Sequence, residues 1–113
     1  MLTSVDFVNV TTGWAVGWNG TNGIILKTAN GGKTWKTQTS GTTYWLRSVF
    51  FVNATTGWTV GDLGTIRKTS NGGKTWKAQT SGTTLGLSAV HFVNARHGWA
   101  VGRAGTILAY KVP

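Results

Sequence analysis

Few side chains in this chain could take part in acid–base or metal chemistry. The 113 residues contain two carboxylates, Asp6 and Asp62, together with two histidines and no cysteine. Hydrolysis of a glycosidic bond normally needs two carboxyl groups, or a tyrosine with acidic helpers, around one carbon atom. A transition-metal site needs several His, Cys or carboxylate ligands at suitable spacing. We therefore predict a protein that is not an enzyme and that holds no metal and no cofactor.

The formal charge of +9 arises from eleven Lys and Arg residues. Such a surface favours acidic proteins, polyanions or anionic membranes, although the charge could also serve solubility alone. The cations are scattered along the chain rather than gathered with aromatic residues in a stripe, so we do not expect nucleic acid to be a partner. No apolar run approaches the roughly 20 residues of a membrane span. The first residues contain no basic stretch followed by an apolar one, so we expect no signal peptide in this chain.

The chain is a tandem repeat, which sets how any functional side chains are positioned. A Gly-Trp-x-Val-Gly motif occurs at 13–17, 57–61 and 98–102. The stretch Asn-Gly-Gly-Lys-Thr-Trp occurs at 30–35 and 71–76. A repeat in the low forties with several short strands is the size of one propeller blade. A single repeat domain over residues 1–113 is predicted, with blades at about 2–45 and 46–86 and a partial blade at 87–113.

Each unit is predicted to form four antiparallel strands, so the fold class is all-β. Glycine and asparagine between the apolar runs tolerate the positive φ that tight turns need. The third unit lacks the last strand, which gives about 2.75 blades per chain. The predicted strands are 2–8, 46–52 and 87–93, then the Gly-Trp-x-Val-Gly motifs, then 24–28, 65–69 and 106–110, and finally 34–38 and 75–79.

The two Asn-Gly-Gly-Lys-Thr-Trp stretches resemble the Asp-box of the bacterial neuraminidase repeat. The whole unit is most similar to the propeller repeat of photosystem II stability/assembly-factor-like proteins. Asn30 and Asn71 stand where the box usually has Asp, and we expect the Asn side chain to bind the turn equally well. The resemblance implies a β-propeller in which the box is a folding element remote from the ligand face. The box residues are Thr28, Asn30, Gly32, Thr34 and Trp35, and Thr69, Asn71, Gly73, Thr75 and Trp76.

An arc of three blades leaves the faces of both terminal blades open. We expect Trp14, Trp58 and Trp99 to be partly exposed in a free arc, because repeat units need neighbours to bury their cores. A closed homo-oligomer would cover them, with a six-bladed dimer favoured over a nine-bladed trimer. The alternatives are a piece of a longer propeller, or an engineered or truncated repeat fragment that assembles with itself and has no ligand.

Residues that depart from the repeat are the best candidates for a binding site. In a four-stranded blade, the loops between the second and third strands and the links between blades lie at one face of the ring. The departures gather in these segments. They combine aromatic rings with amides and a few charges, which suits contact with a peptide or a sugar. The candidate ligand-binding residues are Trp18, Asn19, Asn22, Tyr44, Trp45, Arg47, Asp62 and Arg103.

The resemblance implies a non-catalytic binding and assembly module whose ring face recognises a protein segment or an acidic partner. Arg47 and Arg103 would then supply the anchoring cations, and Trp18, Tyr44 and Trp45 the stacking groups. A lectin-like propeller, in which the same rings stack on sugars, is the alternative. The resemblance slightly favours an extracytoplasmic location, which the sequence itself leaves open.

Overall fold

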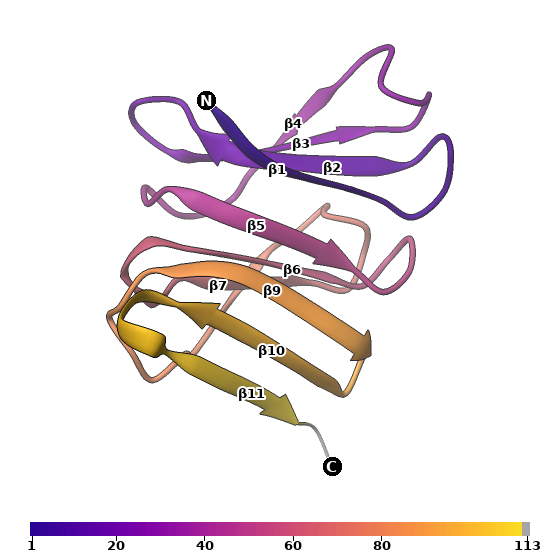
Figure 1. The fold of residues 1–113 in the computed structure, drawn as a ribbon. Helices are drawn as coiled ribbons and strands as arrows, with labels where there is room; N and C mark the ends of the chain where they lie inside the picture. Colours follow the sequence, from indigo (N-terminus) through magenta and orange to yellow (C-terminus); the bar gives the residue numbers. More distant parts are fainter. Residues whose placement is uncertain (112–113) are drawn as a thin grey trace.

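The computed structural model describes residues 1–111, which form eleven strands in three antiparallel sheets (Figure 1). The first sheet has the order β1-β2-β3-β4, the second β5-β6-β7-β8, and the third β9-β10-β11. Two short 3-10 turns, η1 and η2, link β6 to β7 and β10 to β11. The bounds are β1 Leu2–Phe7, β2 Gly13–Trp18, β3 Gly23–Thr28, β4 Lys36–Gln38, β5 Leu46–Phe51, β6 Gly57–Gly61, η1 Asp62–Gly64, β7 Ile66–Thr69, β8 Lys77–Gln79, β9 Leu87–Asn94, β10 His97–Gly102, η2 Arg103–Gly105 and β11 Ile107–Lys111.

The first strands of the three sheets, β1, β5 and β9, follow one another along the inner side of the arc, and the later strands lie progressively further out (Figure 1). Polar bonds cross between these inner strands. The Thr3 hydroxyl donates to the Leu46 carbonyl over 2.6 Å, and the Phe51 amide donates to the Asp6 carboxylate over 2.7 Å. The arrangement is that of propeller blades packed around an axis, as the repeat predicts.

The two glycines of the Gly-Trp-x-Val-Gly motif are explained by groups that lie very close to the second strand of each blade: an aromatic ring at the first glycine and a neighbouring backbone at the second. A Cβ atom at Gly13 would lie 2.6 Å from the Phe7 ring, and one at Gly17 would lie 1.9 Å from the Met1 carbonyl oxygen. The same contacts recur in the other two blades, where Phe51 and Phe92 lie against the first glycine of the motif. Only glycine leaves room for the ring and for the neighbouring strand at these two positions.

The core lies between the sheets and is built around one repeated aromatic stack. Trp14 of the first sheet stacks on Phe51 of the second, with ring centroids 3.5 Å apart and planes 6° apart. Trp58 of the second sheet stacks on Phe92 of the third in the same way, at 3.5 Å and 5°. Stacking of this kind adds to the free energy gained by burying the rings.

The expectation that all three motif tryptophans are partly exposed is wrong for two of them. Trp14 is fully buried and Trp58 is 1% exposed, because each has a following sheet that supplies a phenylalanine. Trp99 has no following sheet among residues 1–111 and is 44% exposed. The exposed large apolar side chains on the outer sheets include Leu2, Val5 and Phe7 on the first sheet and Val93, Trp99, Val101 and Ile107 on the third.

The box hairpins fold as the resemblance implies, with Asn in place of Asp. The Asn30 side-chain oxygen accepts a bond from the Thr34 amide over 3.0 Å, and its nitrogen donates to the Thr34 hydroxyl over 2.8 Å. The Thr28 hydroxyl accepts from the Gly32 amide over 2.9 Å. The second hairpin has the same bonds from Asn71. Because these bonds hold Thr34 and Thr75 within the turn, the fourth strands begin two residues later than predicted, at Lys36 and Lys77.

The turns separate onto two ends of the arc, as the repeat predicts. The β2–β3 loop, η1 and η2 lie at one end, at the left in Figure 1, and the β1–β2, β5–β6 and β9–β10 turns lie at the other. Each box hairpin joins the second group through a backbone bond within its own blade. The Gly31 amide donates to the Thr11 carbonyl, and the Gly72 amide donates to the Thr55 carbonyl, each over 2.9 Å.

Candidate functional site

A hollow of about 580 Å³ opens at the loop end of the second and third blades. Its walls come from the two links between blades and from η1 and η2. Four of the residues expected from the sequence line it together: Tyr44, Arg47, Asp62 and Arg103. Loops carried on a rigid sheet scaffold are common places for binding residues. The structure thus gathers half of the candidate set in one place.

Backbone bonds fix η1 and η2 to the preceding link, so the hollow has firm walls. The Asp62 amide donates to the Trp45 carbonyl over 2.9 Å, and the Arg103 amide donates to the Gly86 carbonyl over 3.0 Å. The residue that follows has a left-handed backbone in both turns, with φ of 56° at Leu63 and 55° at Ala104. This conformation is unusual for residues other than glycine, and it recurs because the two turns are copies.

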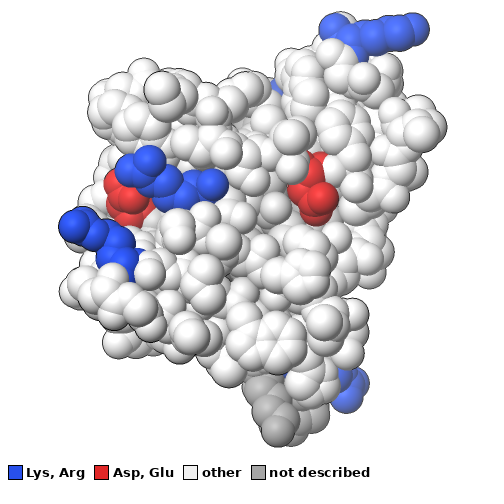
Figure 2. Space-filling model, viewed as in Figure 1, with Lys and Arg blue, Asp and Glu red and all other residues white. Residues whose placement is uncertain are grey.

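The charges in the hollow are unequal. Arg47 pairs with Asp62 through two bonds, Nε to Oδ1 at 2.9 Å and a terminal nitrogen to Oδ2 at 3.2 Å. The same guanidinium lies 4.5 Å from the centre of the Trp45 ring. Arg103 is exposed and makes no salt bridge within residues 1–111. The hollow therefore carries one excess positive charge, on Arg103. Near the left edge of the face in Figure 2, basic side chains lie on both sides of an acidic one.

The other candidate residues lie elsewhere on the same end of the molecule. Trp18 and Trp45 stack on each other, with centroids 5.1 Å apart, and the Trp18 indole donates to the Thr43 carbonyl over 3.1 Å. Neither ring lines the hollow around Arg103 or the smaller hollow beside the first link. Asn19 and Asn22 line a separate hollow of about 420 Å³ beside the first link. Asn19 also holds its own loop, since its side chain accepts from the Asn22 amide over 2.8 Å.

Two leucines in the wall of the first hollow are not among the binding residues predicted from the sequence. Leu63 and Leu85 are both exposed there. Leu85 stands at the position of Tyr44 in the preceding link, and Leu63 stands in η1 where η2 has Ala104. An exposed leucine in a turn next to glycine is the signal that could have identified them, because large apolar side chains in such turns often mark contact surfaces. With Tyr44 they give the hollow an apolar lining beside its charged groups.

Asp6, the other carboxylate, lies on β1 and faces β5, apart from this hollow. Burial raises the pKa of Asp6, while the bond from the Phe51 amide and the nearby His91 act in the opposite direction. Among residues 1–111, no three His or acidic side chains are grouped as they would be around a metal ion. The same part of the chain includes no helix that is long and apolar enough to cross a membrane.

Repeated four-stranded sheets, box hairpins and aromatic stacks between sheets define a β-propeller of the Asp-box type. A family model described as photosynthesis system II assembly factor YCF48 matches residues 38–111. The chain belongs to this family.

Two solved structures share the fold at low sequence identity. The first is described as YCF48 bound to D1 peptide, with a TM-score of 0.82 and 23% identity over 97% of this chain. The second is YCF48 from Cyanidioschyzon merolae, with a TM-score of 0.80 and 22% identity over 97% of this chain. The chain spans 37% and 36% of the length of these two structures. No curated protein matches it.

Proposed function

We propose that this chain is a non-catalytic binding and assembly module that recognises an acidic segment of another protein in the hollow around Arg103. The family match supports an assembly role, and a structural relative is described as bound to a D1 peptide. The observation that carries the proposal is an exposed arginine without a salt bridge in residues 1–111, in a hollow that apolar side chains also line. A cation beside apolar side chains suits a short peptide with both acidic and apolar residues.

Arg47 and Arg103 have different parts in this proposal. Arg47 is already bound to Asp62 and lies over Trp45, so it shapes the wall and neutralises the only acidic side chain in the hollow. Arg103 can offer both arms of its guanidinium to an incoming carboxylate, which is the strongest form of such a bond. Leu63 and Leu85 contact the apolar residues of the segment. With one of the two carboxylates paired to Arg47 and the other on β1, the hollow is a binding site without acid–base chemistry.

The test uses a labelled nonapeptide that alternates leucine with aspartate, and its analogue with asparagine. We expect the acidic peptide to bind, with the affinity reduced at least about tenfold by Arg103→Gln, the usual effect of removing a charged hydrogen-bond partner. Arg96→Gln makes the same charge change in the β9–β10 turn at the other end and should leave binding unchanged. Equal affinity in Arg103→Gln and wild type, measured by fluorescence anisotropy, would contradict the proposal.

Salt and sugar give two further checks on the same site. The affinity should fall as salt rises, because the Debye length shortens from about 10 Å at 0.1 M to about 3 Å at 1 M. A neutral glycan that binds wild type, and that is lost in Trp18→Ala or Trp45→Ala, would instead select the lectin alternative. The mutual stacking of these two rings leaves less aromatic surface for a sugar, which favours the peptide.

We further propose that two copies associate head to tail through their open faces. Phe7 on the first sheet is the repeat counterpart of Phe51 and Phe92, and it is 40% exposed. Trp99 on the third sheet is the counterpart of Trp14 and Trp58. Joining the two faces would reproduce a stack that already occurs twice within the chain. Two copies joined at both ends would form a six-bladed ring, within the usual range of roughly 4–8 blades.

Sedimentation velocity tests this association. Wild type should form a discrete dimer, whereas Trp99→Lys and Phe7→Lys should each be monomeric. Val10→Lys, in an exposed turn away from both faces, adds the same charge and should leave the dimer intact. Wild-type protein that stays monomeric at concentrations on the order of 100 µM would contradict the head-to-tail dimer.

A further inference from the structure

Four of the seven asparagines in this chain stand directly before a glycine: Asn19, Asn22, Asn30 and Asn71. In such a pair the glycine amide nitrogen can reach the side-chain carbon of the asparagine, because glycine has no side chain to hinder the approach. The two groups react within one molecule, so no enzyme is needed to bring them together. In a folded protein the reaction requires a glycine amide that is not held by another bond.

The two pairs in the box hairpins are held against this reaction. The Gly31 amide donates to the Thr11 carbonyl over 2.9 Å. The side-chain nitrogen of Asn30, which would leave as ammonia, donates to the Thr34 hydroxyl over 2.8 Å. The second hairpin repeats both bonds at Asn71 and the glycine that follows it. The attacking nitrogen and the leaving nitrogen are therefore both bound in each hairpin.

Asn22 is protected through its glycine. The Gly23 amide donates to the Thr42 carbonyl over 3.1 Å, and Gly23 is buried at the start of β3. A Cβ atom built there would lie 2.4 Å from the Tyr44 carbonyl oxygen, so the first link packs directly on this glycine. Its nitrogen cannot turn toward the Asn22 side chain while these contacts are in place.

Asn19, in the β2–β3 loop at the left in Figure 1, lacks this protection. Gly20 is exposed, and its amide makes no hydrogen bond within residues 1–111. The Asn19 side-chain oxygen accepts from the Thr21 amide over 3.0 Å, the Thr21 hydroxyl over 3.2 Å and the Asn22 amide over 2.8 Å. Attack on the side-chain carbon places negative charge on this oxygen, so donors already aimed at it stabilise the transition state.

The other blades show which amides of this loop are reached by the link before a blade. In the second and third blades, the link bonds within residues 1–111 to the first residue of the loop alone, Asp62 or Arg103. The first blade already has the corresponding bond, from the Trp18 amide to the Met1 carbonyl over 2.9 Å. By the same pattern, a link before the first blade leaves the Gly20 amide free.

Two other turns hold an asparagine oxygen in the same way without a following glycine. The Asn9 and Asn53 oxygens each accept from two backbone amides and a threonine hydroxyl, over 2.8–2.9 Å. The next residue is Val10 or Ala54, whose side chain hinders the approach of its amide nitrogen. Within residues 1–111, Asn19 alone combines a bonded oxygen, a free amide and a glycine.

We propose that Asn19 is a site of spontaneous deamidation in the folded protein. The Gly20 nitrogen forms a bond to Cγ of Asn19 and loses its proton, the bond from Cγ to Nδ2 breaks, and that nitrogen leaves as ammonia. The product is a five-membered succinimide ring. Water then opens the ring at one of its two carbonyl carbons, which gives either aspartate or isoaspartate. No oxidant or reductant takes part.

The modification changes the charge of the smaller hollow at the loop end. Asn19 and Asn22 line this hollow of about 420 Å³, and its other lining residues are all uncharged. The new carboxylate makes the hollow negative and lowers the formal charge of +9 by one unit. In isoaspartate, the extra backbone carbon also moves the oxygen away from the Thr21 and Asn22 amides. The modified loop therefore disfavours acidic ligands and loses the bonds that hold it.

The test follows each asparagine by peptide mass spectrometry while the folded protein is incubated near neutral pH. Deamidation replaces NH₂ by OH, and fragmentation of the peptides assigns the resulting mass gain to a residue. We expect Asn19 to react at least about tenfold faster than Asn22, Asn30 and Asn71, because these need local unfolding to free the glycine amide. In concentrated urea all four should react at comparable rates.

Ala54→Gly is the matched variant, because it places a glycine after an asparagine that already has the bonded oxygen. The Ala54 amide, like that of Gly20, makes no hydrogen bond within residues 1–111. Asn53 should therefore deamidate at least about tenfold faster in this variant than in wild type, while the rate at Asn19 stays unchanged.

Two results would overturn the proposal. The first is a rate at Asn19 in the folded protein that is no higher than the rates at the other three pairs. The second is an Asn53 that stays as unreactive in Ala54→Gly as in wild type, which would show that the turn with a free amide does not promote the reaction.

Discussion

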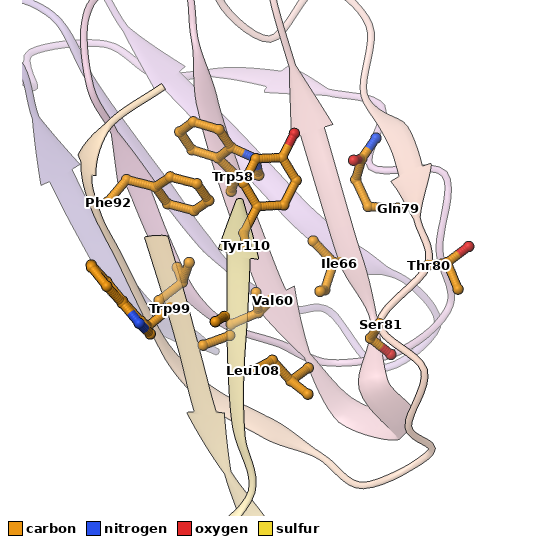
Figure 3. Close-up of a pocket in the computed structure, with 13 residues that line it drawn as sticks. Trp58, Val60, Ile66, Gln79, Thr80, Ser81, Phe92, Trp99, Leu108 and Tyr110 are labelled. Atoms are coloured by element: carbon orange, nitrogen blue, oxygen red, sulfur yellow. The ribbon is translucent and has the colours of Figure 1, made fainter. Parts of the chain in front are cut away.

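The two interfaces between neighbouring sheets have the same centre and different outer ends. Trp14 on Phe51 and Trp58 on Phe92 stack at the same distance of 3.5 Å. At the outer end of the first interface, Trp76 and a glycine carbonyl complete the contact, whereas a groove remains at the second (Figure 3). The same aromatic stack therefore joins both pairs of sheets, while a box hairpin packs at the outer end of the first pair only, among residues 1–111.

The largest difference in the free energy of unfolding is expected between variants of the buried Trp14 and of its exposed repeat counterpart Trp99. Trp14→Ala removes a fully buried ring and should lower the free energy of unfolding by about 3–5 kcal/mol. Trp99→Ala, the matched change on the open face, should cost less than about 1 kcal/mol in the monomer. Urea unfolding followed by circular dichroism measures both, and similar losses would show that a following sheet adds little to the stability that the tryptophan provides.

The box tryptophans give a second matched pair, with a somewhat smaller effect. Trp76 is buried between the first two sheets, whereas Trp35 lies on the open face beside Phe7. Trp76→Ala should cost about 3 kcal/mol, and Trp35→Ala about 1 kcal/mol or less, because only the first leaves a cavity. If Trp35→Ala lowered the free energy of unfolding in urea as much as Trp76→Ala does, the box tryptophan would stabilise its own blade rather than the interface between blades.

A smaller difference in stability is expected from the hydrogen bonds of the two indole groups, Trp14 at the first interface and Trp58 at the second. Trp14→Phe removes a donor from the Gly72 carbonyl, while Trp58→Phe removes a donor that has no partner in the described chain. The first change should therefore cost about 1 kcal/mol more than the second, the usual net value of one hydrogen bond. Parallel urea titrations of the two variants measure this difference. A larger loss in Trp58→Phe would mean that its N–H is satisfied.

The smallest expected effect on stability comes from Asp6 on the inner strand β1, and it depends on pH. Burial raises the pKa of Asp6 above its ordinary value of 3.8, so the folded state favours the protonated acid. Asp6 thus supports folding at low pH, and this support is lost as pH rises from the unfolded pKa through the folded one. Asp6→Asn keeps an acceptor for the Phe51 amide and removes the charge.

The variant should gain stability relative to wild type as pH rises from about 3 to 7. Thermal unfolding of both proteins at the two pH values measures this change. A constant difference between them across that range would contradict the raised pKa.

Much of the fold could be predicted because the repeat fixes the register of each strand. The Gly-Trp-x-Val-Gly motif located the second strands, and the Asn-Gly-Gly stretches located the hairpins. The role of Asn30 also followed, since asparagine and aspartate offer the same acceptor to a turn. The late start of β4 and β8 could not be predicted, because it depends on side-chain bonds that hold Thr34 and Thr75 in the turn.

The candidate site was predictable only at the level of which loops share one end of the molecule. That Arg47 binds Asp62 while Arg103 makes no salt bridge in residues 1–111 depends on distances between loops, which a sequence pattern does not give. The stacking of Trp18 on Trp45 also depends on the distance between two loops, so it could not be predicted either. The exposure of Leu63 and Leu85 could not be predicted, because leucine in a repeat unit normally belongs to the core.

The most direct test of the proposed function is to map where an acidic peptide binds. Backbone amide signals of ¹⁵N-labelled protein would be followed as the leucine–aspartate nonapeptide is added. We predict the largest changes in the second link and the third-blade turn, at Leu85, Gly86 and Arg103, with little change at Gly31 and Gly72 in the box hairpins. Changes confined to the box hairpins, or none when the peptide is in large excess, would contradict an acidic-segment site at the loop end.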